Sequence, residues 1–575
     1  MDSEMIHTTY RNLTEAITTR ARRMPSARLL TLLGDHEPHH FTAADLEAQG
    51  HAYARGLRRA GVEPDDVVVL AIGDLPQLIG AVLGALYRGA IPAIASFGVE
   101  RLDRDIHRAR VAALVRSCAP RALVCTAERA ALFQSLVEGL GCETLSCEDL
   151  YVPPTNGGSD TWPGRAPDDI AYLQYSSGTA GAQKGVMHTH RGVLRYLESK
   201  RKSWAVAHDV LVSWLPLYHD LGFVSGLLCP LVLGTYGVLM SPQQWIRDPK
   251  ILFRALHEYR GSISFMPNFA LNHCVRIIRD RDLEGIDLSH WNELVIGGEP
   301  VREDSLRMFA ERFAPYGFRP SGLRIGYGMA ELVEGVTGSV ICQLPDVDWI
   351  DRVQLETHQR AVPAPPRQPG SVSVVSCGLA IEGAELRVVD AQGEALPERH
   401  VGEILIRSEY MFRGYYLQPE LTARVMRGDW FCSGDLGYLA DGQLYLTGRK
   451  NDLIIVGGRN VHPEDLEPLA DKIPGIYPGR VVAFGVPDAL SGSERIVLLC
   501  ETAPECDAAQ QLAIERRLRS QVTQEFGVTL GDIRFLPRGW IIKTSSGKNA
   551  RPDNRAKYLA QCAGSDPHPP RDSSS

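Results

Sequence analysis

A lysine and several hydroxyl side chains are gathered in a glycine-rich run at residues 175–185. The run reads Tyr-Ser-Ser-Gly-Thr-Ala-Gly-Ala-Gln-Lys-Gly. Glycines let backbone N–H groups crowd around an anion, while hydroxyls add hydrogen-bond donors and a lysine adds positive charge. Because the lysine is flanked by Gln and Gly, the run is not a Walker-type loop, and a plain surface connection has a similar composition. We interpret it as a loop for nucleotide phosphates, with candidate residues Ser176, Ser177, Gly178, Thr179, Gly181 and Lys184.

Six more motifs follow in order along the chain. They are Leu-Pro-Leu-Tyr-His-Asp-Leu-Gly at 215–222, Gly-Gly-Glu-Pro at 297–300, Gly-Tyr-Gly-Met-Ala-Glu at 326–331, Gly-Asp-Leu-Gly at 434–437, Gly-Arg-Lys-Asn-Asp at 448–452 and Thr-Ser-Ser-Gly-Lys at 544–548. In order and spacing, the seven motifs resemble the adenylate-forming superfamily of acyl-CoA synthetases, peptide-synthetase adenylation domains and luciferases. The resemblance covers about 171–559, and such an ordered set is far more specific than any single motif.

Within that superfamily the chain is most similar to the fatty acyl-AMP ligases. The segments that carry this similarity are 214–222, 264–270, 311–320 and 458–467, together with a polar insertion at 346–370. The resemblance implies that ATP, with Mg²⁺, activates a fatty or other carboxylic acid to acyl-AMP with release of pyrophosphate. The acyl group then passes to the phosphopantetheine thiol of an acyl carrier protein. In those ligases the insertion restrains the small C-terminal domain and disfavours free coenzyme A.

The resemblance also assigns residues to the nucleotide. Tyr327 supplies a face for the adenine, and Asp435 accepts hydrogen bonds from the ribose hydroxyls with Arg449 beside it. Taken alone, an aromatic residue is more often core packing and a Gly-Asp pair is a turn. The other expected nucleotide contacts are Gly298, Glu299, Pro300, Gly328, Met329 and Ala330.

Four residues are expected to act on the reacting groups. Lys184 holds the phosphates, and Lys548, brought in by the C-terminal domain, bridges the substrate carboxylate and the α-phosphate; Lys543 is its nearby competitor. Glu331 offers an oxygen ligand to Mg²⁺, although an acid at a helix start is also favoured by the helix dipole. His219 stands at the mouth of an acyl pocket walled by 215–233 and 265–269, or simply caps a turn. No general base is needed, because a carboxylic acid is already ionised at neutral pH.

The chain departs from the superfamily pattern at three positions. Ala180 replaces a usual Thr, Gln183 a usual Pro, and Asn451 a usual Asp or Lys at the hinge. The first change removes a donor, the second loosens the loop, and the third alters domain rotation. Because the phosphate-loop glycines and both lysines remain, we expect an active enzyme.

Composition excludes several other classes of protein. The 575 residues are 44% hydrophobic and 23% charged, and the 61 basic and 69 acidic residues give a net charge of −8 without long single-sign blocks. Because of this charge distribution, we expect no nucleic-acid partner. We also expect no integral membrane association, since no apolar stretch is long enough to span a bilayer. The N-terminus lacks a signal peptide, which predicts a cytoplasmic location. The 12 cysteines form no Cys-x-x-Cys pair and are expected to be buried thiols.

The elements that must position these residues follow an α/β pattern. Strand-like runs at 67–72, 90–94 and 122–125, and later at 210–214, 237–240, 261–265, 293–296 and 322–326, alternate with helix-length segments such as 43–60 and 249–259. This alternation predicts two α/β layers. We expect a large N-terminal domain at 1–449 with a small β-rich subdomain from about 371, a mobile α/β C-terminal domain at 450–563 and a disordered tail at 564–575.

Two alternative functions remain open on the sequence. An acyl-CoA or other carboxylate-CoA ligase shares the first half-reaction and finishes on coenzyme A. A nonenzymatic nucleotide-binding protein predicts no carboxylate-dependent release of pyrophosphate.

Overall fold

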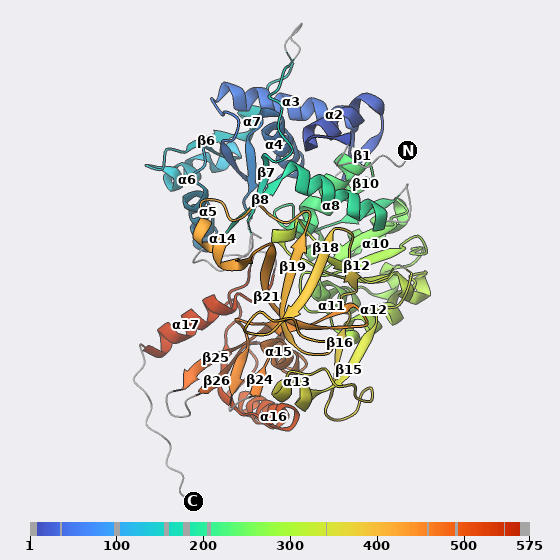
Figure 1. The fold of residues 1–575 in the computed structure, drawn as a ribbon, viewed down its shortest axis with the longest axis vertical. Helices are drawn as coiled ribbons and strands as arrows, with labels where there is room; N and C mark the ends of the chain where they lie inside the picture. Colours follow the sequence, from blue (N-terminus) through green and yellow to red (C-terminus); the bar gives the residue numbers. More distant parts are fainter. Residues whose placement is uncertain are drawn as a thin grey trace, which may run out of the picture.

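Two mainly parallel β-sheets form the centre of the N-terminal part of the chain (Figure 1). The computed structural model describes residues 9–34, 37–96, 104–154, 160–175, 184–203, 209–340, 342–456, 459–488, 493–544 and 547–563. One sheet has nine strands in the order β17-β14-β13-β12-β11-β9-β10-β1-β2, and the other has six in the order β6-β5-β3-β4-β7-β8. The α/β fold with two layers is therefore confirmed.

The strands of the two sheets include one at each of the eight predicted apolar runs. In the six-stranded sheet they are β3 (Val67–Ala71), β4 (Ile91–Ile94), β5 (Ala122–Cys125), β6 (Glu143–Ser146), β7 (Ile170–Tyr175) and β8 (Gly185–Thr189). In the nine-stranded sheet they are β1 (Arg28–Leu32), β2 (His39–Thr42), β9 (Val210–Ser213), β10 (Tyr236–Leu239), β11 (Ile263–Met266), β12 (Glu293–Ile296), β13 (Leu323–Tyr327), β14 (Thr337–Gly338) and β17 (Leu379–Ala380). Every residue of β3, β4, β5 and β11 is buried, as expected for strands covered on both faces.

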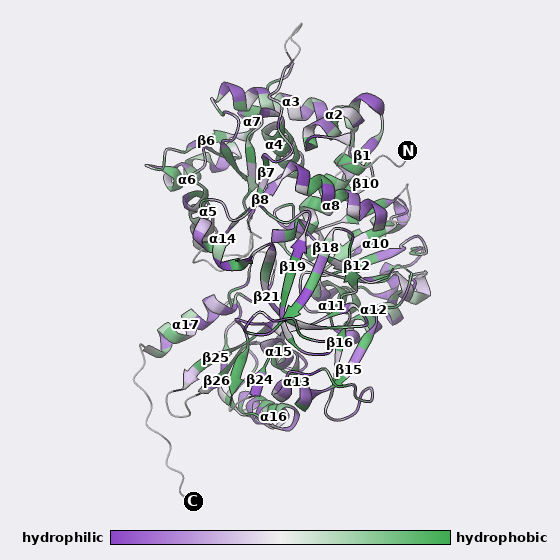
Figure 2. Ribbon diagram, in the orientation of Figure 1, coloured by the Kyte–Doolittle hydropathy of each residue, from purple (hydrophilic) through white to green (hydrophobic). Residues whose placement is uncertain are grey.

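Amphipathic helices cover these sheets. They include α2 (Leu13–Arg23), α3 (Ala43–Arg59), α4 (Leu75–Arg88), α8 (His190–Ser203), α10 (Lys250–Glu258), α11 (Asn268–Ile277) and α12 (Glu303–Phe313). A capping box of Thr42 and Asp45 starts α3, because each side chain satisfies a backbone N–H of the first turn. Figure 2 shows hydrophilic residues on the outer turns of α2 and α3, and their buried faces join the central core.

One helix, like most of α4, is buried along nearly its whole length. The π-helix η1 (Leu221–Leu233) begins at the Asp220 cap and ends at Gly234, and its residues 222–232 are buried. Its surface is apolar apart from Ser225, as expected for a helix inside a core. This helix carries most of the segment that we expected to wall an acyl pocket.

A five-stranded antiparallel sheet follows the two large sheets. It contains β18 (Ala384–Val389), β19 (Gly402–Ser408), β20 (Met426–Arg427), β21 (Trp430–Ala440) and β22 (Gln443–Arg449). The predicted β-rich segment started at about 371, but β16 (Ser371–Val375) pairs with β15 and β17 joins the nine-stranded sheet. The sheet itself therefore starts at Ala384.

The insertion at 346–370 has secondary structure of its own. It contains β15 (Val347–Asp351), antiparallel to β16, and α13 (Arg352–His358), which Asp351 caps. Figure 1 shows α13 beside α16 (Ala508–Phe526) of the C-terminal region, and the Arg352 guanidinium lies 4.4 Å from the ring centroid of Phe526.

The C-terminal region is a smaller α/β unit at the bottom of Figure 1. A three-stranded sheet, β25 (Ile476–Asp488), β26 (Ser493–Thr502) and β27 (Leu530–Leu536), packs with α15 (Pro463–Asp471) and α16 around a core of its own. The hairpin of β23 (Ile454–Val456) and β24 (Arg459–Val461) precedes the sheet, and α17 (Arg551–Ala563) follows it.

Within the described ranges, no helix has the length and apolar character needed to cross a membrane. Nine of the 12 cysteines are buried, as expected. The predicted tail at 564–575 lies outside the described residues.

Candidate active site

A cavity of about 840 Å³ opens where the two large sheets, the five-stranded sheet and the C-terminal region meet. Strand ends and the turns after them supply most of its wall, as is usual for ligand sites in α/β folds. The expected site residues that line it are Lys184, His219, Gly298, Tyr327, Gly328, Met329, Ala330, Glu331, Asp435, Arg449 and Lys548. The structure therefore brings together residues that are separated by most of the chain.

Asp435 is the centre of a buried polar cluster in this cavity. The Tyr327 hydroxyl donates to Asp435 Oδ2 at 2.7 Å, and Arg449 Nε donates to Oδ1 at 3.1 Å. The antiparallel register of β21 and β22 places Asp435 opposite Arg449, so the pair is fixed by the sheet. Burial raises the pKa of Tyr327 far above its usual range, which keeps its hydroxyl a donor.

Two glycines on the cavity lining have conformations or surroundings that favour glycine. A Cβ on Gly328 would lie 1.9 Å from the carbonyl oxygen of Glu334, so only glycine fits at that turn. Gly298 has a φ of +80°, and a Cβ there would lie 4.0 Å from Lys548 Nζ. Gly328 is therefore required by the backbone packed against it, and Gly298 by its left-handed backbone, close to Lys548.

The next two residues of the Gly-Glu-Pro run are placed differently. Glu299 Oε1 accepts a hydrogen bond of 2.5 Å from the backbone N–H of Phe269, in the first turn of α11. Burial raises the pKa of Glu299, although the Lys548 and Lys543 ammonium groups oppose this shift. The adenine contacts expected of Glu299 and Pro300 stay predictions.

Tyr415, which no sequence motif indicated, lies between Lys184 and Glu331 and contacts both side chains. The Tyr415 hydroxyl donates to Glu331 Oε1 at 2.7 Å, while Lys184 Nζ lies 5.2 Å from the centroid of the Tyr415 ring. Backbone bonds between β8 and 413–416 hold Tyr415 there. No motif marked this tyrosine, because the pairing joins segments more than 200 residues apart.

Most of the expected phosphate loop lies outside the residues that the structure describes. Ser176, Ser177, Gly178, Thr179 and Gly181 lie outside the described residues, as do Ala180 and Gln183. Strands β7 and β8 enter and leave the segment, and Lys184 at its end lines the cavity.

Lys548 reaches the cavity from the C-terminal region. Its backbone N–H donates to Thr544 Oγ1 at 3.1 Å, and Gly547 between them has a φ of +83°. Burial and the neighbouring Arg449 lower the pKa of Lys548, while nearby carboxylates oppose the shift. Lys548 is among the residues that line the cavity, and its competitor Lys543 is not. The Glu467 and Asp471 carboxylates interact electrostatically with Lys543.

His219 borders the cavity together with Asp220. His219 Nδ1 lies 2.5 Å from Asp220 Oδ1, and Asp220 also caps η1. Burial acts to raise the pKa of Asp220, but His219, the Leu221 N–H and Lys548 outweigh it and lower the value. Asp220 therefore adds a carboxylate to the site, and its position next to His219 in the motif was the available signal.

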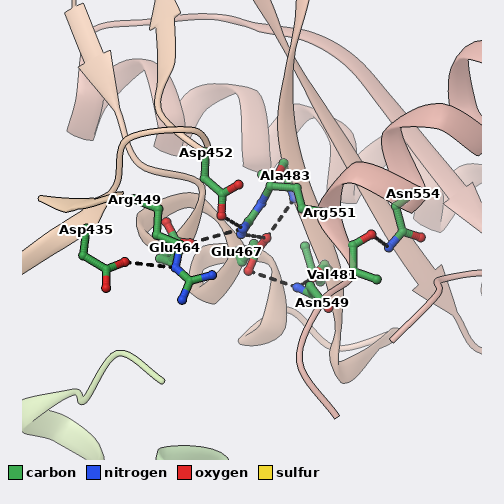
Figure 3. Close-up of polar contacts among 11 residues, drawn as sticks. Asp435, Arg449, Asp452, Glu464, Glu467, Val481, Ala483, Asn549, Arg551 and Asn554 are labelled. Atoms are coloured by element: carbon green, nitrogen blue, oxygen red, sulfur yellow. Dashed lines mark hydrogen bonds and ion pairs between the residues drawn. The ribbon is translucent and has the colours of Figure 1, made fainter. Parts of the chain in front are cut away.

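A second polar cluster ties the Lys548 segment to the hinge segment (Figure 3). Arg551 donates to Asp452 Oδ2 and to Glu467 Oε1, both at 2.8 Å, and lies 3.2 Å from Glu464. Asn549 donates to Glu467 at 3.1 Å. The segment that carries Lys548 is thus fixed to the chain that leaves Arg449.

Lysine and arginine side chains from two structural units meet carboxylates in this cavity, a combination suited to binding and reacting a nucleotide's phosphates. The chain belongs to the AMP-binding enzyme family, whose model matches residues 17–416.

Relatives and solved structures cover nearly the whole chain. The chain is 31% identical to the long-chain-fatty-acid–AMP ligase FadD32 of Mycolicibacterium smegmatis, over 91% of this chain and 90% of that protein. It is 30% identical to the medium-chain-fatty-acid–[acyl-carrier-protein] ligase JamA of Moorena producens, over 92% and 91%. A solved structure from a study of fatty acyl-adenylate ligases of E. coli and L. pneumophila superposes with a TM-score of 0.89 at 30% identity, covering 98% of this chain and 100% of that one.

Proposed function

We propose that the protein uses ATP to convert a fatty acid to acyl-AMP, with release of pyrophosphate, and passes the acyl group to the phosphopantetheine thiol of an acyl carrier protein. The observation that carries the proposal is the presence of Lys548 in one cavity with Asp435, Arg449 and Lys184. The likeness to a long-chain-fatty-acid–AMP ligase and to an acyl-carrier-protein ligase supports the choice of acid and acceptor.

The nucleotide would lie along the cavity from Asp435 to Lys184. The Asp435 carboxylate is oriented by Tyr327 and Arg449 and is suited to accept both ribose hydroxyls. Lys184 and the adjoining segment would hold the phosphates that leave as pyrophosphate. Gly298 and Tyr327 border the space proposed for adenine.

Glu331 would offer a carboxylate oxygen to a Mg²⁺ bound together with the nucleotide phosphates. Among the described residues no group of three or more histidine, cysteine or acidic side chains is placed to hold a metal, and Glu331 is the cavity carboxylate that we assign to the ion. Mg²⁺ is usually held by one or two carboxylates together with phosphate oxygens and water. When bound, the ion would supply positive charge to the phosphates.

In the proposed reaction, the protein orients the reacting groups and stabilises the negative charge that develops on the phosphate. The substrate carboxylate attacks the α-phosphorus in line, and the bond to pyrophosphate breaks. Negative charge then builds on the phosphate oxygens, where the ammonium of Lys548 offsets it. His219 and Asp220 would border the entering carboxylate.

The insertion is proposed to disfavour free coenzyme A. Its helix α13 lies against the C-terminal region through Arg352 and Phe526, a contact that supports restraint of that region. The alternative acceptor, free coenzyme A, makes the protein an acyl-CoA ligase.

Two assays test the proposal. Pyrophosphate release is measured across fatty, hydroxy, amino and aryl acids, and the expected result is release that requires both ATP and a fatty or modified fatty acid. Acyl-AMP is then supplied to free coenzyme A or to a phosphopantetheinylated carrier protein. Efficient acyl-CoA formation would reject the carrier as the acceptor, and absence of acid-dependent release would reject the adenylation itself.

A further inference from the structure

A buried ion pair that the proposed reaction does not use stands in the wall of the same cavity. The Lys200 ammonium on α8 donates to a carboxylate oxygen of Glu334, just after the short helix η5 (Ala330–Leu332), and to the hydroxyl of Ser225 on η1. The Ser225 hydroxyl lies 2.8 and 2.9 Å from the two carboxylate oxygens of Glu334. The Lys200 and Glu334 side chains are only 7% and 4% exposed, and both line the cavity.

The surroundings of this ion pair are mostly apolar. Lys200 Nζ lies 4.6 Å from the ring centroid of Phe265 and 5.6 Å from that of Tyr196, and both rings line the cavity. Phe265 belongs to the segment expected to wall the acyl pocket. Burial raises the pKa of Glu334 and Asp220 adds to this, whereas Lys200 and Ser225 lower it. The Lys200–Glu334 ion pair is therefore a polar site in a part of the cavity wall that is otherwise mainly apolar.

Such a pair is costly beside an unsubstituted hydrocarbon chain. Burying two charges carries a desolvation penalty that their attraction barely repays, and well-packed apolar residues are often as stable. A plain fatty chain in this part of the cavity would cover the pair with methylene groups that offer no hydrogen bond. A charged substituent would be attracted by one member of the pair and repelled by the other, and it would leave an uncompensated charge buried.

A neutral hydroxyl group matches both members. It accepts a hydrogen bond from an ammonium and donates one to a carboxylate, so it adds a partner to each without a net charge. We infer that the cavity selects a carboxylic acid that carries a hydroxyl group on its chain, recognised by Lys200 and Glu334. The inference rests on the proposed function, because it requires an acid in this cavity.

The unmodified enzyme provides the first test. Pyrophosphate release is measured with octanoic, β-hydroxyoctanoic and ω-hydroxyoctanoic acid, and with dodecanoic and ω-hydroxydodecanoic acid. At least one hydroxy acid should exceed its parent acid in kcat/KM by about tenfold or more, because a site built to bond a hydroxyl discriminates against its absence. If every parent acid is used as well as its hydroxy form, the inference is overturned and the proposed function stands. If no acid releases pyrophosphate, the proposed function itself fails.

A double substitution provides the second test. Lys200→Met with Glu334→Leu removes both charges together, because removing one would leave the other buried without its partner. The ratio of kcat/KM between hydroxy and parent acid should fall by about tenfold, toward one. The matched control is Lys202→Met with Glu382→Leu. Lys202 also lies on α8, and its Nζ is 2.6 Å from Glu382 Oε1 in an exposed ion pair.

The control pair should leave the ratio unchanged. A double variant that folds, as judged by its melting temperature, and keeps the original ratio would overturn the inference. If that variant does not fold, the comparison of acids on the unmodified enzyme still decides.

Discussion

At the scale of single residues, Lys548 is the side chain whose loss should separate chemistry from binding. Lys548→Met should lower the rate of acid-dependent pyrophosphate exchange by about 10²–10³-fold, because its charge acts on oxygens that become more negative in the transition state. ATP affinity should change by less than about threefold, since other residues hold the nucleotide. Exchange of labelled pyrophosphate measures the first quantity, and ATP titration of the acid-free enzyme measures the second.

The matched control for this lysine is Lys472→Met. Lys472 belongs to the same C-terminal region, and its ion pair with Asp304, at 3.9 Å, is exposed. Such surface pairs contribute little, so its rate should stay near the unmodified value. Equal losses of ATP binding and of turnover in the Lys548 variant would contradict a role confined to the chemical step.

The Tyr327 hydroxyl is expected to act on ATP affinity through Asp435. Tyr327→Phe removes the 2.7 Å bond to a buried carboxylate oxygen, a loss of about 1–2 kcal/mol. KM for ATP should therefore rise about tenfold with kcat nearly unchanged. Tyr438→Phe is the control, because Tyr438 donates to Asp348 at 2.9 Å in a similar buried pair outside the cavity lining. A fall in kcat at constant KM would argue that Tyr327 serves the chemical step instead.

At the scale of elements, the contact between α13 and the C-terminal region should depend on pH through Glu356. Burial raises the pKa of this carboxyl from 4.5 to about 7, with Asp465 adding to the shift and Arg352 and Arg459 opposing it. Because the folded pKa is the higher one, the group contributes stability below pH 4.5 that is lost as the pH rises through about 7.

Glu356→Gln stays neutral and should keep that stability. Its melting temperature should exceed that of the unmodified protein at about pH 8, and the difference should shrink as the pH falls toward about 5. Glu525→Gln, an exposed position on α16, should show no such pH-dependent difference. A difference that is constant with pH would exclude titration of Glu356 as its cause.

The sequence predicted the elements whose apolar runs are local and continuous. Strands such as β3 and β5, and helices such as α3, are encoded within their own residues, so their positions were predicted to within a few residues. Strand β1 was missed because its place depends on parallel pairing with β10, about 200 residues further on. The same limit applies to β8, whose pairing with the segment at 413–416 positions Tyr415.

The sequence predicted those residues of the candidate site that belong to recognisable motifs, and it missed the others. Asp435, Tyr327 and Lys548 were expected from motifs that resemble a known superfamily, and all three line one cavity. Lys200 and Glu334 belong to no such pattern and are 134 residues apart, so only tertiary packing, such as that of α8 against η1, brings them together. A lone buried charge cannot be recognised in a sequence until its partner is known.

At the scale of the whole molecule, the orientation of the C-terminal region should control which half-reaction proceeds. Arg302, just before α12, donates to the backbone carbonyl of Glu464 and lies 3.3 Å from Asp465, both on α15. This contact is one of those that join the C-terminal region to the rest of the chain in the orientation that places Lys548 in the cavity. Transfer to a carrier thiol needs access to the acyl-AMP, so this orientation suits adenylation.

Arg302→Met should therefore slow adenylation by about fivefold, since a half-exposed ion pair is worth up to about 1 kcal/mol. Transfer that starts from added acyl-AMP should be unaffected, because it does not require Lys548 in place. The matched control is Arg307→Met, since Arg307 pairs with Asp304 and Glu311 on its own helix. Single-turnover assays of each half-reaction measure the two rates separately. Equal slowing of both would show that Arg302 supports the fold rather than the orientation of the two parts.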